Sequence, residues 1–457
     1  MSEHRIEQDS MGELRVPARA LYGAQTQRAI NNFPISGKPL PLAFIKSLLK
    51  IKKAAALANS ELGELDADIA NAICGAVDLL LADKHLLQHF PIDVFQTGSG
   101  TSTNMNANEV LANLATKKLG KEVNANDHVN CGQSSNDTIP TAIHVSAALL
   151  LSQELIPALE HLQLTIEKKA VNLKEYVKTG RTHLMDALPV TMEQSLLSWA
   201  AQIEQNLDNL KQFQATIQKV AQGGTAVGTG VNAHPDFASH FCRQLNNLTS
   251  LEFTPAANKF ALIGSQDTAV VLSGLLKATA VSIMKIANDL RWMNSGPLSG
   301  IGEIALPALQ PGSSIMPGKV NPVMPEAAAM VAAQVLGNDL AITVGGQSGN
   351  FELNVMLPLV AYNLCESLEI LANVSRLLAD DSIAGFTVIS ENLTKALAKN
   401  PILVTALNPI IGYSKAAQIA KQAYAEKRPI IDVAVESTDL SREELEQLLD
   451  PKRLTEN

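Results

Sequence analysis

Four short polar clusters stand directly before long stretches of helical pattern, and they hold the residue types that could do chemistry. The clusters begin at Thr97, Gln133, Gly180 and Gly312, and they are rich in Ser, Thr, Asn or Gly. Free N–H groups at a helix start carry partial positive charge, and hydroxyl and amide side chains add directed donors. One such cluster alone indicates ordinary helix capping. Several that converge would form a pocket for a small anion.

The fourth cluster, Gly312–Pro322, reads GSSIMPGKVNP and combines a cation, an amide and tandem hydroxyls. Lys319 could bind a carboxylate, and Asn321 supplies an amide donor. A serine is a poor base at neutral pH, so Ser313 could accept a proton only if Lys319 and the loop amides stabilised its alkoxide. The segment therefore indicates proton transfer at a small anion, and a plain glycine-rich turn is the alternative interpretation.

Nucleotide-binding motifs do not fit the glycine-bearing segments. Five residues separate Gly312 from Gly318, whereas a P-loop has four between its glycines. After Gly98-Ser99-Gly100, Thr103 stands where a dinucleotide fingerprint has its third glycine, and no clear strand precedes the segment. Phosphate cradles of these two kinds are excluded.

His183 is the histidine best placed for acid–base chemistry, because it follows Arg181 and Thr182 in a polar turn. An imidazole there can titrate near neutral pH and exchange a proton with substrate or water. A purely structural histidine is the alternative. A catalytic ring would need a carboxylate to orient it, and the sequence offers Glu326 and Asp186.

Metal and disulfide chemistry are not expected. His85 and His89 have the spacing of a helical pair, but the glutamate of a zincin motif is missing. The cysteines are far apart and form no CxxC pair: they are Cys74, Cys131, Cys242 and Cys365. The charged N-terminal residues predict no signal peptide. We expect a cytoplasmic protein with reduced thiols, no metal and no cofactor.

The charge balance argues against polyanionic partners. The 457 residues include 36 Lys+Arg and 45 Asp+Glu, which gives a net charge of −9. A nucleic-acid-binding or polybasic membrane-surface protein needs a basic face. No uninterrupted apolar run reaches the about 18 residues of a membrane span. The most apolar stretch, Ala327–Leu336, is too short, and we expect neither nucleic acid nor a membrane as partner.

The elements that must position these residues are long helices. Apolar residues recur at spacings of three and four from Thr191 to Gln222, which predicts one helix ended by Gly223-Gly224. Similar patterns cover Thr138–Val177, Ser265–Met293, Pro325–Leu340 and Pro358–Leu378. We expect a mostly α fold, an elongated bundle of long helices with smaller N- and C-terminal domains, divided at 1–133, 134–390 and 391–457. Stretches that are apolar on several faces predict burial against other subunits.

At these residues the chain resembles the fumarase/aspartase superfamily, and its similarity to class II fumarases covers nearly the whole sequence. Gly312–Pro322 is similar to the superfamily signature, which is highly specific. The other segments that match fumarase motifs follow in the right order: Leu21–Arg28, Thr97–Asn104, Gln133–Asp137, Gly180–His183 and Gly349–Val355.

The resemblance implies a three-domain subunit of a homotetramer whose active sites are each assembled from three chains. It implies metal-free, reversible hydration of fumarate to (S)-malate in the tricarboxylic acid cycle, through an aci-carboxylate. By the same resemblance, Ser313 would remove the C3 proton, and His183 paired with Glu326 would handle the proton on the hydroxyl side. The implied substrate-binding residues are Ser99, Gly100, Thr101, Ser134, Ser135, Asn136, Thr182, Ser314, Lys319, Val320 and Asn321.

One segment departs from the family pattern. Class II fumarases often carry a second dicarboxylate site that reads His-Pro-Asn-Asp, and here the corresponding residues are Asn124, Ala125, Asn126 and Asp127. The histidine and proline are absent from this possible second site.

Three rival functions remain open at this point. An aspartase would carry a different residue in place of His183. The lyases of the superfamily that act on larger substrates share only the Gly312–Pro322 signature with this chain. A non-catalytic crystallin on the same scaffold would have no need to retain Ser313, Lys319 and His183 together.

Overall fold

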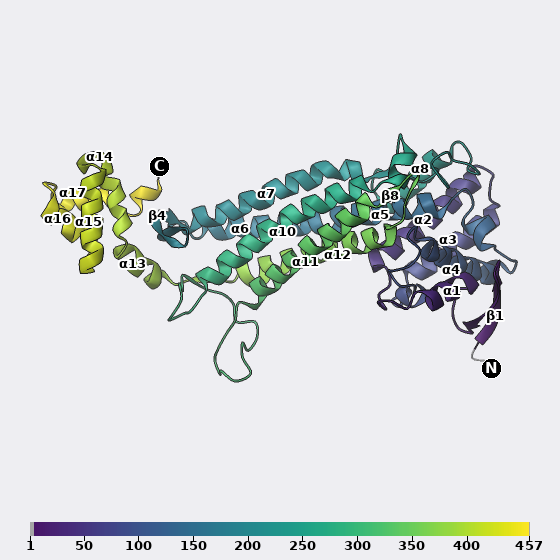
Figure 1. The fold of residues 1–457 in the computed structure, drawn as a ribbon, viewed down its shortest axis with the longest axis horizontal. Coiled ribbons are helices and arrows are strands. Elements are labelled where there is room, and N and C mark those ends of the chain that lie inside the picture. Colours follow the sequence, from purple (N-terminus) through teal and green to yellow (C-terminus); the bar gives the residue numbers. More distant parts are fainter. Residues whose placement is uncertain (1–3, 457) are drawn as a thin grey trace. The chain divides into compact units, whose positions relative to one another are not determined.

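The computed structural model describes residues 4–456, and it is mostly helical, as the sequence predicts (Figure 1). It contains two compact units, each assembled from three segments of the chain. Unit 1 comprises Met1–Pro157, Asp208–Ala280 and Ala333–Ala372, and unit 2 comprises Ala158–Leu207, Val281–Ala332 and Asn373–Asn457. The three-domain division at residues 133 and 390 rests on sequence texture and stays a prediction.

Long helices form where the apolar pattern predicts them. In α7 (Met192–Ile217) the stripe residues Leu196, Ile203, Leu207 and Leu210 are all buried. Burial of such a stripe, more than helix propensity, is what stabilises a helix of this length. The other long helices are α6 (Ile156–Val171), α10 (Asp267–Met293), α11 (Val323–Gln347) and α12 (Leu357–Leu378).

Unit 1 packs helices α2 and α5 against each other, with α3 and α4 alongside (Figure 1). Its α2 is rich in Leu, Ala and Lys, which are good helix formers, and α4 ends at Gly120, whose φ of 74° suits a left-handed cap. The helices and turns of this unit are α1 (Ala24–Asn32), α2 (Leu42–Glu61), α3 (Ala67–Leu81), η1 (Leu86–His89), α4 (Thr101–Leu119), η2 (Ala125–Val129), α5 (Ser135–Leu150), η3 (Leu151–Leu155), α8 (Phe237–Thr249) and α9 (Lys259–Gly264).

Short two-stranded sheets close the loops of unit 1. The N-terminal hairpin pairs β1 (His4–Asp9) with β2 (Gly12–Pro17) in antiparallel register. One more pair joins distant segments, since β5 (Lys219–Val220) lies parallel to β6 (Thr254–Pro255). A tight hairpin pairs β8 (Gly349–Asn350) with β9 (Leu353–Asn354).

Unit 2 holds a hairpin of β3 (Val177–Thr182) and β4 (Met185–Thr191), with a register shift between Thr179 and Arg181. A short pair joins β7 (Ile304–Ala305) to β10 (Thr387–Val388). The remaining elements are η4 (Ala379–Ile383), α13 (Ser390–Ala398), η5 (Pro401–Leu407), α14 (Asn408–Ile411), α15 (Tyr413–Glu426), α16 (Ile430–Ser437), α17 (Arg442–Leu448) and η6 (Arg453–Thr455). The last helices share a small apolar core around Leu407, Val433 and Leu445, all 0% exposed.

Two sequence expectations need correction. The predicted helix to Gln222 ends at Ile217, because Lys219–Val220 pairs as a strand with a segment more than thirty residues away. The pattern Thr138–Val177 contains α5, a π-turn and α6, and it ends at Val171.

The expectation that no segment is long and apolar enough to span a membrane is also wrong. Three helical stretches are long and apolar enough by length and composition: Ser135–Val171, Asp267–Met293 and Val323–Gln347. Isolated polar residues interrupt their apolar runs, which is why a search for uninterrupted runs misses them. In the single chain 33% of the apolar window of α11 is buried, so this helix presents much apolar surface.

Candidate active site

The first polar cluster forms the start of α4. Gly100 is the residue before the helix and has a φ of 71°, a left-handed value that favours glycine. A Cβ on Gly100 would also lie 2.9 Å from Cγ2 of Ile139 on α5, so two constraints require glycine here. Ser99 Oγ and Thr101 Oγ1 lie 2.8 Å apart at the helix start. The N–H groups of Ser102 and Thr103 already donate to Thr97 Oγ1, at 3.1 Å, and to Gln96 Oε1, at 3.0 Å. The two hydroxyls are therefore the donors that this helix start can offer to an anion.

The second cluster begins α5 with a capping box. The Ser134 side chain accepts a hydrogen bond from the Asn136 N–H at 3.2 Å, and Asp137 Oδ1 accepts from the Ser134 N–H at 2.9 Å. Asp137 Oδ2 accepts two more, from Gly223 and Thr225. Burial raises the pKa of Asp137 to about 6, although these donors oppose the rise. Asp137 thus fixes the helix start on which Ser134, Ser135 and Asn136 stand.

The structure brings these first two clusters together within unit 1. Asn104 on α4 donates through Nδ2 to Ser135 Oγ at 3.0 Å. Because Ser135 accepts this bond, its own hydroxyl proton is free to donate to a carboxylate. Together with the contact between Gly100 and Ile139, this bond confirms that the starts of α4 and α5 are neighbours.

The third cluster lies at the tip of the β3–β4 hairpin in unit 2. Thr182 ends β3, and His183 and Leu184 form the turn with φ values of 55° and 61°. Left-handed φ values are uncommon for residues other than glycine, so the surrounding structure must hold His183 and Leu184 in this turn. Thr182 and His183 are exposed in the single chain. Within residues 4–456 the His183 ring makes no hydrogen bond to Glu326 or Asp186, so its pairing with Glu326 stays a prediction.

A buried carboxylate that the sequence analysis missed holds β3 in place. Glu303, 5% exposed, accepts two hydrogen bonds from the Arg181 guanidinium, at 2.5 and 2.8 Å, and one from Lys178 Nζ at 3.0 Å. Burial alone would raise the pKa of Glu303, but the two cations lower it below its usual value. Because Arg181 directly precedes Thr182 and His183, this ionic cluster positions the start of the turn. Glu303 is more than a hundred residues away in sequence, and no local motif marks it.

The fourth cluster is a loop closed on itself, also in unit 2. The Gly312 N–H donates to the Lys319 carbonyl at 2.8 Å, and Asn321 Nδ2 donates to the Gly312 carbonyl at 2.7 Å. Lys319 Nζ donates to Asn321 Oδ1 at 2.6 Å. A Cβ on Gly312 would lie 2.6 Å from the Lys319 carbonyl oxygen, so glycine is required at this crossing. Ser314, Lys319 and Val320 are exposed in the single chain.

Ser313 begins a short turn of this loop and caps it with its side chain. Its Oγ accepts hydrogen bonds from the backbone N–H groups of Ile315, at 3.2 Å, and Met316, at 3.0 Å. Two amide donors on one oxygen favour its anionic form, which is the arrangement that a serine base needs.

A cavity of about 870 Å³ lies beside this loop, and Lys319, Val320, Asn321 and Glu326 line one side of it. Arg291 and Asn294, from the end of α10 and the residues after it, line another. The cavity can therefore present two cations and three amides, counting Asn288, to an anion, and Glu326 adds one carboxylate to the lining. Arg291 is another residue that sequence reasoning missed, since it lies in a helix rather than in a polar cluster.

The Asn124–Asp127 segment uses its own donors. Asn124 Oδ1 accepts from the N–H groups of Asn126, at 2.8 Å, and Asp127, at 3.0 Å. The Asn124 N–H in turn donates to His128 Nδ1 at 2.9 Å. The amides that an anion would need are thus partnered inside the segment, and a second site here, with Ala125 included, stays an untested prediction.

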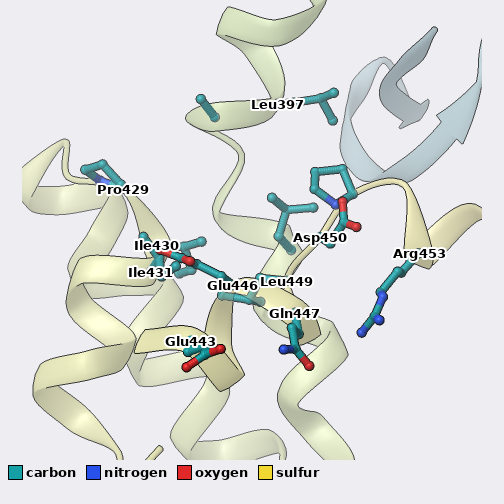
Figure 2. Close-up of a pocket in the computed structure, with 13 residues that line it drawn as sticks. Leu397, Pro429, Ile430, Ile431, Glu443, Glu446, Gln447, Leu449, Asp450 and Arg453 are labelled. Atoms are coloured by element: carbon teal, nitrogen blue, oxygen red, sulfur yellow. The ribbon is translucent and has the colours of Figure 1, made fainter. Parts of the chain in front are cut away.

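A different cavity, of about 680 Å³, lies among the C-terminal helices (Figure 2). Its walls are mainly apolar, with Leu397 and Ile430 among them, and Glu443, Glu446 and Asp450 stand around it. No predicted site residue lines this cavity, and its carboxylates make it a poor site for a dianion. Across residues 4–456 no group of three His, Cys, Asp or Glu side chains is arranged to hold a metal ion.

Comparison with known proteins agrees with these motifs. Residues 12–337 match the family model described as "Lyase", and residues 403–456 match "Fumarase C C-terminus". The chain is 66% identical over 455 residues to the fumarate hydratase class II 2 of Pseudomonas aeruginosa, covering 100% of this chain and 99% of that protein. It is 56% identical to the fumarate hydratase class II of Xylella fastidiosa, covering 99% and 96%.

The fold matches as well. The crystal structure of class II fumarase from Schistosoma mansoni superimposes with a TM-score of 0.95 at 37% identity and covers 98% of both chains. Full-length identity, both family models and the shared fold lead to one conclusion: the chain belongs to the class II fumarate hydratases, carbon–oxygen lyases of the fumarate lyase superfamily.

Proposed function

We propose that this fumarate hydratase interconverts fumarate and (S)-malate by metal-free acid–base chemistry, through an aci-carboxylate intermediate. In the dehydration direction, Ser313 removes the C3 proton of malate and the electron pair moves into the adjacent carboxylate. The hydroxyl at C2 then leaves as water, with a proton supplied on the side of His183. Glu326 orients His183 and stabilises its charged form.

The observation that carries this proposal is the double amide contact to Ser313 Oγ. The aci-carboxylate carries an added negative charge, so lowering its barrier depends on fixed donors where that charge develops. Lys319 and Asn321 supply such donors next to the serine, on a loop whose own hydrogen bonds already shape it.

The starts of α4 and α5 supply the second set of carboxylate donors in this proposal. Ser99, Gly100 and Thr101 stand at one helix start, and Ser134, Ser135 and Asn136 stand at the other. The free hydroxyl proton of Ser135 supports a donor role for this residue. Thr182, Ser314 and Val320 complete the proposed contacts.

We also propose a homotetramer whose active sites each draw residues from three chains. Large apolar side chains on α11 support it, because Met330 is 68% exposed and Leu340 is 65% exposed in the single chain. Exposed apolar faces of this kind mark interfaces. Light scattering on the purified protein measures the assembly directly, and a monomeric mass would contradict it.

The activity is tested by following the ultraviolet absorbance of fumarate with malate and aspartate in parallel. We expect turnover with malate, no comparable ammonia release from aspartate, and no loss of rate after chelator treatment. Rate lost to a chelator and restored by a metal would contradict the metal-free mechanism. Aspartate turnover at a similar rate would favour an aspartase.

The role of Ser313 is tested by Ser313→Ala. We expect kcat to fall by about 10³-fold or more, since the variant lacks the base, while the melting temperature and assembly stay those of the wild type. Ser314→Ala is the matched control, because it removes a neighbouring hydroxyl that is proposed to bind and not to take the proton. A near-normal kcat in Ser313→Ala would remove Ser313 from the mechanism.

A further inference from the structure

A charged side chain is buried beneath the carboxylate-binding helix starts of unit 1. Lys52 on α2 is 0% exposed, and its Nζ donates to Asn130 Oδ1 and Gln133 Oε1, both at 3.0 Å. Burial lowers the pKa of Lys52 to about 7, and the charge of Asp137 opposes this shift. A buried ammonium is costly, and an apolar side chain of similar length would fill the same volume without that cost. The core alone does not explain a lysine here.

The two acceptors of Lys52 are themselves fixed by their other bonds. Asn130 Oδ1 also accepts from Asn104 Nδ2, at 3.2 Å, and from Asn108 Nδ2, at 3.1 Å. Gln133 Nε2 donates to the carbonyls of Val129 and Cys131. These bonds hold the oxygen of each amide toward the ammonium. The orientation of both amides is therefore fixed, and Lys52 is the charged donor to both of their oxygens.

This network ends at the proposed substrate donors. Asn104, which shares its amide between Asn130 and Ser135, belongs to the helix that begins at Thr101. Gln133 immediately precedes Ser134, the capping residue of α5. Lys52 is therefore linked to Ser135 through two intermediate side chains, Asn130 and Asn104. A second path leads from Lys52 through Gln133 and its backbone to Ser134.

We infer that Lys52 is a positioning residue for substrate binding, an inference that rests on the proposed function. Lys52 orders the amide network so that Ser135 offers its proton to a substrate carboxylate. The buried charge of Lys52 also favours an anion at these helix starts. A charge in a low-dielectric interior acts with little screening by salt. Its loss weakens binding of a dicarboxylate more than it slows proton transfer, because the proposed base and acid stand on other segments.

The test compares three variants on α2. Lys52→Met removes the charge and both hydrogen bonds, and Lys52→Gln keeps an amide donor without the charge. Lys53→Met is the control, because it removes the neighbouring ammonium, which is paired with Asp78 at 2.6 Å on a more exposed face. Each variant is measured for KM and kcat with fumarate, for inhibition by succinate, and for melting temperature.

We expect Lys52→Met to raise KM and the succinate inhibition constant about tenfold, with kcat within about threefold of the wild type. The melting temperature falls by no more than a few degrees, because Gln133 Oε1 loses its hydrogen bond. Lys52→Gln recovers part of the KM effect, and Lys53→Met matches the wild type. KM of the wild type rises as the pH is raised through about 7, where Lys52 loses its proton, and Lys52→Met lacks this rise. Asp137 is the charged group that faces Lys52 in this titration.

Two outcomes would overturn the inference. One is an unchanged KM in Lys52→Met. The other is a large fall of both kcat and melting temperature alongside the rise in KM in both Lys52 variants, which shows a structural role alone. Failure of the wild type itself to hydrate fumarate is a separate result, because it overturns the proposed function and the inference with it.

Discussion

Replacing Glu303 by glutamine tests whether a buried ionic cluster holds the His183 turn. The substitution keeps the side-chain shape and one oxygen acceptor, but it removes the charge that Arg181 and Lys178 share. Lys178 and Glu303 are each 5% exposed, so Glu303→Gln leaves Lys178 buried without its counter-charge. The perturbation is therefore electrostatic rather than steric.

The structure sets the size of the effect. Removing one partner of a buried ion pair costs about 3–5 kcal/mol. The retained amide oxygen and the partial exposure of Arg181, whose side chain is 20% exposed, place Glu303→Gln near the lower end, at about 3 kcal/mol. In a chain of this size that loss lowers the melting temperature by a few degrees. We also expect a lower kcat, because Arg181 precedes Thr182 and His183.

The pH dependence has a defined sign. The pKa of Glu303 is lowered in the folded state from a usual value of 4.5, so its carboxylate contributes stability that is fully present above that value. This contribution is lost as the pH falls from 4.5 through the lowered pKa. The difference in melting temperature between wild type and variant is therefore full at pH 7 and shrinks below pH 4.5.

Thermal unfolding followed by circular dichroism, with fumarate turnover measured in parallel, checks this prediction. Glu175→Gln is the matched control, because Glu175 pairs with Lys452 at 2.6 Å on the exposed surface of the same unit. Exposed pairs contribute little, so the control melts like the wild type. Equal melting temperatures for both variants at pH 7 would refute the reasoning.

Three further outcomes are expected. Gly100→Ala raises KM several-fold and lowers the melting temperature, because its φ of 71° and the 2.9 Å approach to Ile139 leave no room for a methyl group; unchanged kinetics and melting would contradict this. Leu340→Glu on α11 reduces the mass seen by light scattering, since it places a charge on a face proposed to be covered by another subunit; a wild-type mass would argue against that interface. In native protein Cys242 and Cys365 react slowly with a thiol reagent at pH 8, because burial raises the pKa of each to about 12, and denaturation should release both thiols to fast reaction.

Helix positions were predictable because they depend on local patterns. The apolar stripe of α7 is visible in the spacing of its residues, and the capping box at Ser134 is visible in its residue types. The end of α7 was not predictable, because it depends on strand pairing between Lys219–Val220 and Thr254–Pro255. Non-local pairing of this kind leaves no mark in a sequence window.

The site residues divide in the same way. Ser313 and His183 lie in polar clusters whose composition indicates chemistry. Glu303 supports the His183 turn from a position 122 residues from Arg181, so its role emerges only from the fold. The position of Lys52 is marked in the sequence, because it interrupts the apolar helix face formed by Leu48, Leu49 and Ala55. A lysine on a buried face indicates a buried hydrogen-bond or ionic partner.

The acidic balance of the chain can be reconciled with a dianionic substrate through distance and burial. Exposed charges are largely screened beyond about 8 Å at physiological salt, so most of the net charge of −9 does not reach the site. In the proposed mechanism, the substrate meets a local set of cations and donors: Lys319 and the loop amides, and the starts of α4 and α5. Lys52 strengthens the second set because its charge is fully buried and therefore weakly screened. A chain with an acidic balance can thus bind an anion wherever cations and donors are gathered locally.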